Sequence, residues 1–290
     1  RKTISNAQMD KMLRIQLENS LIKVENELEF LKQRYIKTAN AGMSYGIVIH
    51  EIEKSRDHTE LMLSAMGADL TVDNLDITVK PTNDLTAVNV DVPGDISSAA
   101  FFLVLGAIMP NSQITVTNVG INPTRTGIID VLKDMGADIT LENVHTSAGE
   151  TVADITVRSS SLKGTTVGGD IIPRLIDELP IIAVAAVFAD GQTVIKDAQE
   201  LKVKETNRIR AVVDEFNKCG IDITETDDGM IINGGKSIHG ADFKTYGDHR
   251  MAMSLTVLAQ LADGESTLDA SDCACVSYPT FFDDFYKLGK

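Results

Sequence analysis

Cysteines and long apolar runs are both scarce in this sequence. Its 290 residues include three cysteines, and two of them form Cys273-Ala274-Cys275, a pattern that matches neither a disulfide framework nor a zinc site. The longest apolar runs, residues 99–109 and 181–189, are much shorter than the roughly 20 residues that a membrane-spanning helix needs. No secretory signal is visible at the N-terminus. We therefore expect a soluble, cytoplasmic protein without a metal site.

Positive charge is also in short supply. The formal net charge is −15, which argues against a broad nucleic-acid-binding surface. An anionic small molecule remains a suitable ligand, because a local group of cations can override the net charge of the whole chain. The apolar content of 43% is enough for the core of one large domain or two ordinary ones.

The first part of the chain, residues 1–53, differs from the rest. It has no proline, and a long polar helix is predicted over about residues 8–38. Its apolar residues alternate steps of four and three, which predicts a coiled-coil seam over 17–35 that could self-associate. They are Leu17, Leu21, Val24, Leu28, Leu31 and Tyr35. Whether this segment is a natural part of the protein or a fused one stays open at this point.

A histidine follows this helix in the pair His50-Glu51. A His-Glu pair after a dimerising helix resembles the phosphoacceptor helix of sensor histidine kinases. A dimerising or phosphoacceptor module that carries an inactive lobe is therefore one hypothesis. It is disfavoured, because no ATP-binding glycine boxes follow and a lone histidine is more often structural.

From about residue 54 onward the sequence contains an internal repeat. Residues 66–71 read MGADLT, residues 135–140 read MGADIT, and residues 219–224 read CGIDIT. Each copy follows an amphipathic helical pattern, has a glycine at the helix-stop position and continues into a stretch typical of a strand. The repeat predicts a unit of alternating helices and strands and thus an α/β fold.

Three further segments, 99–109, 180–189 and 251–262, are apolar nearly all round, which predicts helices buried on every side. Each follows a polar cluster that suits a helix N-cap. The clusters are Asp95-Ile96-Ser97-Ser98, Asp177-Glu178 and Asp248-His249-Arg250. If the repeats are related by rotation, the three helix starts point the same way, and their free N–H groups would form an anion-attracting face.

One predicted helix, over residues 201–220, has two cations in its first turn, Lys204 and Arg208. The helix dipole disfavours cations there. An anion bound at the helix start would explain both residues. The alternative is that both are solvated and pair with Glu200 and Glu205.

Seven motifs, in this order along the chain, resemble the second half of 5-enolpyruvylshikimate-3-phosphate synthase. They are Ser55-Arg56-Asp57-His58-Thr59-Glu60, Asp91-Val92-Pro93-Gly94-Asp95-Ile96-Ser97-Ser98-Ala99, Asn122-Pro123-Thr124-Arg125-Thr126-Gly127, Ile176-Asp177-Glu178-Leu179-Pro180, Val203-Lys204-Glu205-Thr206-Asn207-Arg208, Gly247-Asp248-His249-Arg250 and Ser277-Tyr278-Pro279. The resemblance implies two lobes, each of three βαβαββ units around parallel inner helices. It also implies enolpyruvyl transfer from phosphoenolpyruvate to the 5-hydroxyl of shikimate 3-phosphate, in the shikimate pathway to the aromatic amino acids, without a metal or organic cofactor.

The resemblance also assigns roles to individual residues. Catalysis is expected from Asp177 at the 5-hydroxyl proton, from Lys204 as a proton donor between the two substrates, and from Glu205 at the methylene carbon. Substrate binding is expected from Asp177, Lys204 and four further residues: Arg56, Arg208, His249 and Arg250. The alternatives are a helix cap for Asp177, a backbone-satisfied histidine for His249 and a surface ion pair for Arg56. For Ser97-Ser98 we prefer a capping role over phosphate binding.

The resemblance divides the chain into three parts: the helical segment 1–53, the end of the substrate-binding lobe over 54–92, and the C-terminal lobe over 93–290. Motifs of the family's first half do not occur, so we expect little or no activity from this chain alone, and complementation by a first lobe. Asn207 and Val276 also depart from the residues common in the family. A related activity, that of UDP-N-acetylglucosamine enolpyruvyl transferase, is disfavoured by the Lys-Glu-Thr-x-Arg and Asp-His-Arg motifs.

Overall fold

The computed structural model describes residues 58–73, 76–80 and 85–288. The chain divides between residues 55 and 56, and every described residue belongs to the second part. Three predictions therefore lie outside the described residues: the coiled-coil seam over 17–35, the His50-Glu51 pair and the role of Arg56.

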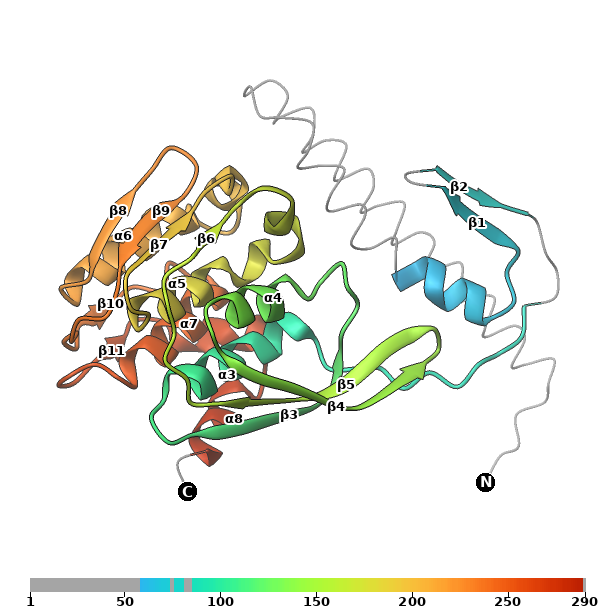
Figure 1. Ribbon diagram of the computed structural model, residues 1–290, viewed down its shortest axis with the longest axis horizontal. Coiled ribbons are helices and arrows are strands. Elements are labelled where there is room, and N and C mark those ends of the chain that lie inside the picture. The colour runs from blue at the N-terminus through green and yellow to red at the C-terminus, as the bar shows by residue number, and fades with distance from the viewer. Residues whose placement is uncertain (1–57, 74–75, 81–84, 289–290) are drawn as a thin grey trace. The chain divides into compact units, whose positions relative to one another are not determined.

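Three apolar helices form the centre of the described region (Figure 1). They are α3 (Ile96–Ile108), α5 (Leu179–Val187) and α7 (His249–Ala259). Every residue of α5 is buried, as is every residue of α3 except Ser98. The three helices pack against one another. The prediction of three buried helices is confirmed for α3 and α5 and for residues 251–258 of α7, whereas residues 259–262 are the partly exposed end of α7 and the turn that follows it.

Two sheets flank these helices (Figure 1). The first is antiparallel, has the order β3-β5-β4 and contacts α3; its strands are β3 (Gln113–Gly120), β4 (Asp138–Ser147) and β5 (Glu150–Arg158). The second has the order β6-β7-β9-β8 and contacts α5; its strands are β6 (Thr166–Val167), β7 (Gln192–Ile195), β8 (Asp222–Glu225) and β9 (Met230–Asn233). Strands β6 and β7 pair in parallel, whereas the other pairs of this sheet are antiparallel.

The repeated glycine motif has the same local structure in all three copies. A helix precedes each glycine: residues 58–65, α4 (Gly127–Asp134) and α6 (Arg208–Lys218). Gly67, Gly136 and Gly220 have φ angles of 88°, 94° and 76°, which a residue with a side chain rarely adopts. A strand follows each: β1 (Leu70–Asp73), β4 and β8. Strand β1 pairs with β2 (Asp76–Val79) in an antiparallel hairpin. The helix-stop prediction for these glycines is confirmed.

The C-terminal part returns the chain to the central helices. Strand β10 (Asp242–Phe243) precedes α7 in the sequence and β11 (Thr267–Leu268) follows it, and the two strands pair in parallel. Next along the chain are η4 (Ser271–Val276) and α8 (Phe281–Lys287). The ring of Phe281, at the start of α8, lies 5.9 and 5.7 Å from those of Phe101 and Phe102 in α3. This aromatic group fixes the end of the described chain to the first buried helix.

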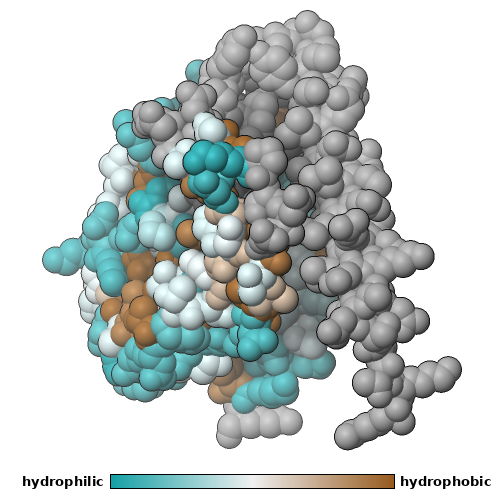
Figure 2. All heavy atoms as spheres, turned by 90° about the vertical axis from the view of Figure 1, so that its right-hand side faces the viewer, coloured by the Kyte–Doolittle hydropathy of each residue, from teal (hydrophilic) through white to brown (hydrophobic). Residues whose placement is uncertain are grey.

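Figure 2 shows one face on which hydrophilic and hydrophobic residues of the described part are intermingled. No helix among the described residues is long and apolar enough to cross a membrane.

Two sequence predictions about helix starts are wrong. The helix predicted over 201–220 is divided: η3 (Gln199–Val203) is a short 3₁₀ helix, and α6 begins only at Arg208, where the side chain of Asn207 accepts a hydrogen bond from the backbone N–H of Arg210. Lys204 therefore precedes the helix. Ser97 and Ser98 are not caps, because the cap of α3 is Asp95, whose carboxylate accepts from the backbone N–H of Ser98.

Candidate functional site

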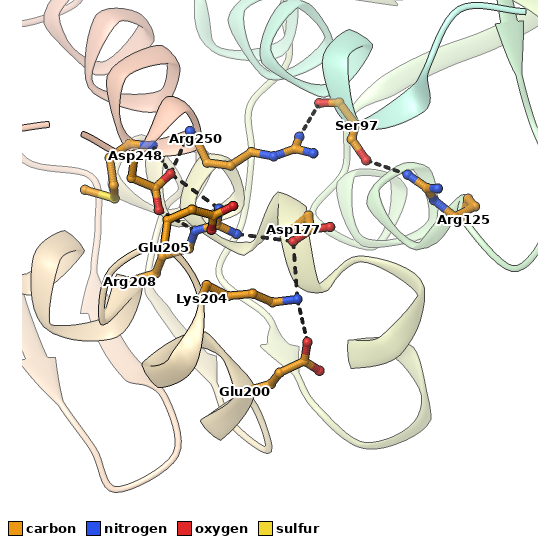
Figure 3. A network of polar contacts seen from close by, with 10 residues as sticks. Ser97, Arg125, Asp177, Glu200, Lys204, Glu205, Arg208, Asp248 and Arg250 are labelled. Carbon is orange, nitrogen blue, oxygen red and sulfur yellow. Dashed lines mark hydrogen bonds and ion pairs between the residues drawn. The ribbon is translucent and has the colours of Figure 1, made fainter. Parts of the chain in front are cut away.

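The residues that the motifs single out meet where three helices begin (Figure 3). Asp177 lies in η2 (Ile176–Glu178), the 3₁₀ turn that leads into α5. Arg208 is the first residue of α6, and Asp248 is the N-cap of α7. Because α5, α6 and α7 contact one another, these starts lie close together.

Arg208 is the centre of the cluster and contacts three carboxylates. Its Nε and Nη2 donate to the two carboxylate oxygens of Asp248, at 2.8 and 3.3 Å. Its Nη1 donates to Asp177 at 3.2 Å, and its Nη2 also donates to Glu205 at 2.6 Å. The side chain is only 1% exposed. Burial alone would lower the pKa of this guanidinium, but the carboxylates of Asp248, Glu205 and Asp177 raise it, so Arg208 stays charged.

Asp248 has two functions in the structure. Its carboxylate caps α7 by accepting from the backbone N–H groups of Arg250 and Met251, at 2.8 and 3.3 Å. The same carboxylate forms the two hydrogen bonds to Arg208, and its side chain is fully buried. Asp248 thus joins the start of α7 to the start of α6 through a buried ion pair.

Lys204 lies between two carboxylates. Its Nζ is 2.5 Å from Glu200 and 3.7 Å from Asp177, and its side chain is 8% exposed. The predicted alternative, in which Lys204 and Arg208 pair with Glu200 and Glu205, is therefore correct about the partners. It is wrong about solvation, since both cations are buried.

Arg250 has a different kind of partner. Its Nη1 donates to the backbone carbonyl of Ser97, at 3.2 Å, and so links the start of α7 to the start of α3 (Figure 3). Among the described residues Arg250 forms no ion pair. Arg250 therefore has no direct carboxylate partner in this part of the chain, in contrast to Arg208.

His249 is half-buried beside these groups. The pKa of its imidazole is lowered, mainly by burial and also by the charge of Arg250. The ring is therefore neutral at pH 7. Counting Asp177, Glu200, Glu205 and Asp248 against Lys204, Arg208 and Arg250 gives four carboxylates and three cations, a net charge of −1 in the absence of a ligand.

The structure thus brings together six of the seven predicted site residues, and the seventh, Arg56, lies outside the described residues. Asp177, Lys204, Glu205 and Arg208 are linked directly by ion pairs. His249 and Arg250 directly follow Asp248, so they are attached through the start of α7. The side chain of Asp177 binds Arg208 rather than capping α5, whose N-cap residue is Glu178.

Sequence reasoning missed two members of the cluster. Glu200 was considered only as a solvated partner of Lys204, and Asp248 only as a helix cap. The pairing of Lys204 with Glu200 follows an i,i+4 spacing, whereas no periodic pattern points to the pairing of Asp248 with Arg208. The one signal for Asp248 was its position next to His249 and Arg250 in the same motif.

Chemically, the cluster combines a proton acceptor with cations. The carboxylate of Asp177 lies 3.7 Å from the buried amine of Lys204 and 3.2 Å from the buried guanidinium of Arg208. The cations can stabilise negative charge on a ligand. Among residues 58–73, 76–80 and 85–288 no group of three or more His, Cys, Asp or Glu side chains could hold a metal ion.

Comparison with known proteins places this chain in a described family. Residues 35–285 match the family described as EPSP synthase (3-phosphoshikimate 1-carboxyvinyltransferase). The match begins ahead of residue 54, where the resemblance carried by the motifs begins. A 3-phosphoshikimate 1-carboxyvinyltransferase of Listeria welshimeri is 53% identical over 244 residues, which are 84% of this chain and 57% of the relative. One of Bacillus cereus is 56% identical over 236 residues, 81% of this chain and 55% of the relative.

Solved structures give the same result. An EPSP synthase structure from Acinetobacter baumannii matches with a TM-score of 0.77 and 42% identity, and the match covers 80% of this chain and 54% of that one. The enolpyruvyl transferase NikO of Streptomyces tendae shares the fold, with a TM-score of 0.60 and 21% identity. That match covers 78% of this chain and 51% of the NikO chain. The chain spans about half the length of the curated relatives that it matches. With its buried helices, its motifs and most of its length matched, the chain belongs to the EPSP synthase family.

Proposed function

We propose that this chain carries the C-terminal half of an active site for enolpyruvyl transfer from phosphoenolpyruvate to shikimate 3-phosphate. The observation that supports this most strongly is the cluster of buried cations and carboxylates at the starts of α5, α6 and α7. A reaction between two phosphorylated, carboxylated substrates needs cations for their charges and a carboxylate for proton transfer.

The proposed reaction has two stages. The 5-hydroxyl oxygen of shikimate 3-phosphate bonds to C2 of phosphoenolpyruvate and loses its proton, while the C3 methylene gains a proton. The resulting tetrahedral adduct then loses phosphate from C2 and a proton from C3, which restores the double bond. The site must therefore accept a proton from an oxygen and exchange a proton with a carbon.

We assign these steps to three residues. Asp177 accepts the hydroxyl proton, because its carboxylate lies directly beside the cations that would bind the substrates, Lys204 and Arg208. Lys204 donates a proton and lies between the two substrates. Glu205, the most exposed carboxylate of the cluster, exchanges the proton at the methylene carbon. Arg250 and Arg208 bind the carboxylate or phosphate of phosphoenolpyruvate, with His249 beside them.

The contacts of the two arginines add an order to these events. Arg208 is buried and its guanidinium is already occupied by three carboxylates, whereas Arg250 has only a neutral carbonyl partner among the described residues. An incoming anion therefore meets Arg250 first. It reaches Arg208 only by displacing the carboxylate of Glu205, whose side chain is 49% exposed. Glu205 thus competes with the ligand before it takes part in the reaction.

Titration of the 290-residue chain with phosphoenolpyruvate and with shikimate 3-phosphate, followed by NMR or calorimetry, tests the proposal. Arg250→Met should weaken phosphoenolpyruvate binding by about 1.5–3 kcal/mol, the range for hydrogen bonds to charged groups, or about ten- to a hundredfold. Glu205→Gln should strengthen binding, since it removes the competing charge. Arg210→Met is the matched control, because this arginine is 62% exposed and pairs on the surface with Asp214 and Glu225.

Phosphate release measures the reaction itself. The chain alone should show little turnover, and addition of a first-half fragment from a complete relative should raise it, since positioning supplies much of the barrier reduction. Lys204→Ala should abolish the restored activity. Equal phosphoenolpyruvate affinity in wild type and Arg250→Met, in a protein that binds, would place the site elsewhere. Full turnover by the chain alone would contradict the half-site.

A further inference from the structure

Arg250 owes its orientation to a residue in another repeat. Its guanidinium extends from the start of α7 to the first turn of α3, where the carbonyl of Ser97 accepts from Nη1 (Figure 3). Ser97 is 1% exposed. The carbonyl is neutral, so this contact fixes the arginine without cancelling its charge. What keeps Ser97 in place therefore matters for the proposed anion site.

A second arginine, Arg125, lies on the other side of Ser97 (Figure 3). Its Nη2 donates to the hydroxyl of Ser97 at 2.9 Å and to the carboxylate of Asp95 at 3.2 Å. The other carboxylate oxygen of Asp95 accepts from the backbone N–H and the hydroxyl of Ser98, both at 3.1 Å. Both oxygens of Asp95 are thus occupied, and its charge is paired with that of Arg125.

The loop that carries Arg125 is held from several sides. Within the loop, the side-chain oxygen of Asn122 accepts from the backbone N–H and the hydroxyl of Thr124, at 3.1 and 2.9 Å. From outside, Arg174 at the end of η1 (Gly169–Arg174) donates to the carbonyl of Pro123 at 2.7 Å and to Asp130 at 2.7 Å. These bonds fix the position from which Arg125 reaches α3.

The end of the loop is closely packed as well. A Cβ atom at Gly127 would lie 2.8 Å from a methyl carbon of Leu175 and 3.1 Å from the backbone carbon of Arg174. Only glycine fits there without displacing the segment that leads to Asp177. The loop over 122–127, one of the motifs to which the resemblance assigned no role, is therefore a rigid support between two parts of the site.

We propose that Arg125 is a positioning residue for Arg250. By pairing with Asp95 and bonding to Ser97, it leaves Arg250 with a neutral partner and a guanidinium that is available to the ligand. That this ligand is phosphoenolpyruvate rests on the proposed function. The positioning itself is a property of the ligand-free chain.

The physical reason is competition for one carboxylate. Asp95 is two residues from Ser97, whose carbonyl Arg250 contacts. Without Arg125, one oxygen of Asp95 loses its partner, and Arg250 is the nearby cation that lacks a carboxylate among the described residues. An ion pair between Arg250 and Asp95 would cancel the charge on which anion binding depends. Arg125 therefore keeps Asp95 away from Arg250.

The guanidinium NMR signals of Arg250 in the ligand-free 290-residue chain test this directly, once Arg250→Lys has identified them. Arg125→Gln should shift the Arg250 signals and weaken phosphoenolpyruvate binding about tenfold, which is the lower end for a charged hydrogen bond. Arg125→Lys keeps a cation beside Asp95 and should leave the signals near those of the wild type. Arg125→Gln combined with Asp95→Asn should restore them, because asparagine still caps α3 but attracts no cation.

The control is Arg158→Gln on β5, which removes a surface arginine paired with Asp138 and should change neither readout. If Arg125 only stabilised the fold, Arg125→Gln would lower stability, and adding Asp95→Asn would not restore the Arg250 signals. Unchanged Arg250 signals in Arg125→Gln, or failure of Asp95→Asn to restore them, would overturn the proposal.

If Arg125→Gln does not fold, an Arg125→Lys variant with shifted Arg250 signals would overturn it equally. A chain that binds no phosphoenolpyruvate would count against the proposed function, while the signals of Arg250 would still decide this inference.

Discussion

Replacement of Asp248 is the sharpest test of the buried ion cluster. Removal of one partner of a buried ion pair costs about 3–5 kcal/mol, because the other charge stays buried. In Asp248→Asn, Arg208 keeps Asp177 and Glu205 as partners, and asparagine still caps α7. We therefore expect the lower end of the range, about 3 kcal/mol. Asp248→Ala also loses the cap to Arg250 and Met251, which adds about 1 kcal/mol.

Urea unfolding followed by circular dichroism measures both changes. With an m-value of about 2–3 kcal/mol/M, a loss of 3 kcal/mol lowers the midpoint by about 1–1.5 M. The matched control is Asp214→Asn, which breaks an exposed pair with Arg210 and should cost at most about 1 kcal/mol. If Asp248→Asn lowers the free energy of unfolding no more than Asp214→Asn does, the burial of the charged Arg208 does not depend on Asp248, and the reasoning is refuted. Equal costs for Asn and Ala would show that the cap contributes nothing.

Two further predictions concern His249 and the N-terminal segment. Because the folded-state pKa of His249 is lowered from 6.5, mainly by burial, the unfolded chain binds this proton more readily, and stability should fall as pH falls from about 6.5 through the lowered pKa. His249→Asn should reduce the difference in unfolding free energy between pH 7.5 and pH 5.5; an unchanged difference would argue against this linkage. The seam over 17–35 should drive self-association, so that replacing Leu21 and Leu28 with serine reduces the fraction of any dimer and thus the average mass seen in sedimentation. The same mass in both proteins would show that the seam does not hold the dimer together.

Much of the fold could be predicted because it depends on local patterns. The helices α3 and α5 and residues 251–258 of α7 are apolar nearly all round, and such a composition predicts a buried helix. Gly67, Gly136 and Gly220 end helices with a positive φ angle, a backbone conformation that residues with a side chain rarely adopt. The capping role of Asp95 and Asp248 followed from their place ahead of an apolar run. Each of these features is decided within a few residues.

The start of α6 shows where local patterns are insufficient. The spacing of Ile209, Val212, Val213 and Phe216 predicts the buried face of this helix, but it does not determine the first residue. The N-cap decides that, and the signal was present in Asn207, which accepts from the N–H of Arg210. Asparagine at this position, noted as a departure from the family, thus performs a function that aspartate performs equally well.

The long-range pairing within the site could not be predicted from local patterns, unlike the pairs Lys204–Glu200 and Arg208–Glu205. Arg208 binds Asp177 and Asp248 across 31 and 40 residues, and no periodicity in the sequence connects such distant positions. Ion pairs between Arg208 and each of these residues depend on how the repeats dock. The motifs identified most of the participants through the family resemblance, whereas the contacts required the structure.

The wide spacing of these contacts along the chain has a consequence for the order of folding. Arg250 reaches Ser97 across 153 residues, so this link forms only after a very long loop has closed. Loop closure delays non-local contacts relative to local helices and hairpins. A chain that has folded one or two repeats contains the individual residues but not the cluster. A ligand bound here therefore selects molecules in which all three helix starts have docked, and by mass action it stabilises that complete arrangement rather than any single repeat.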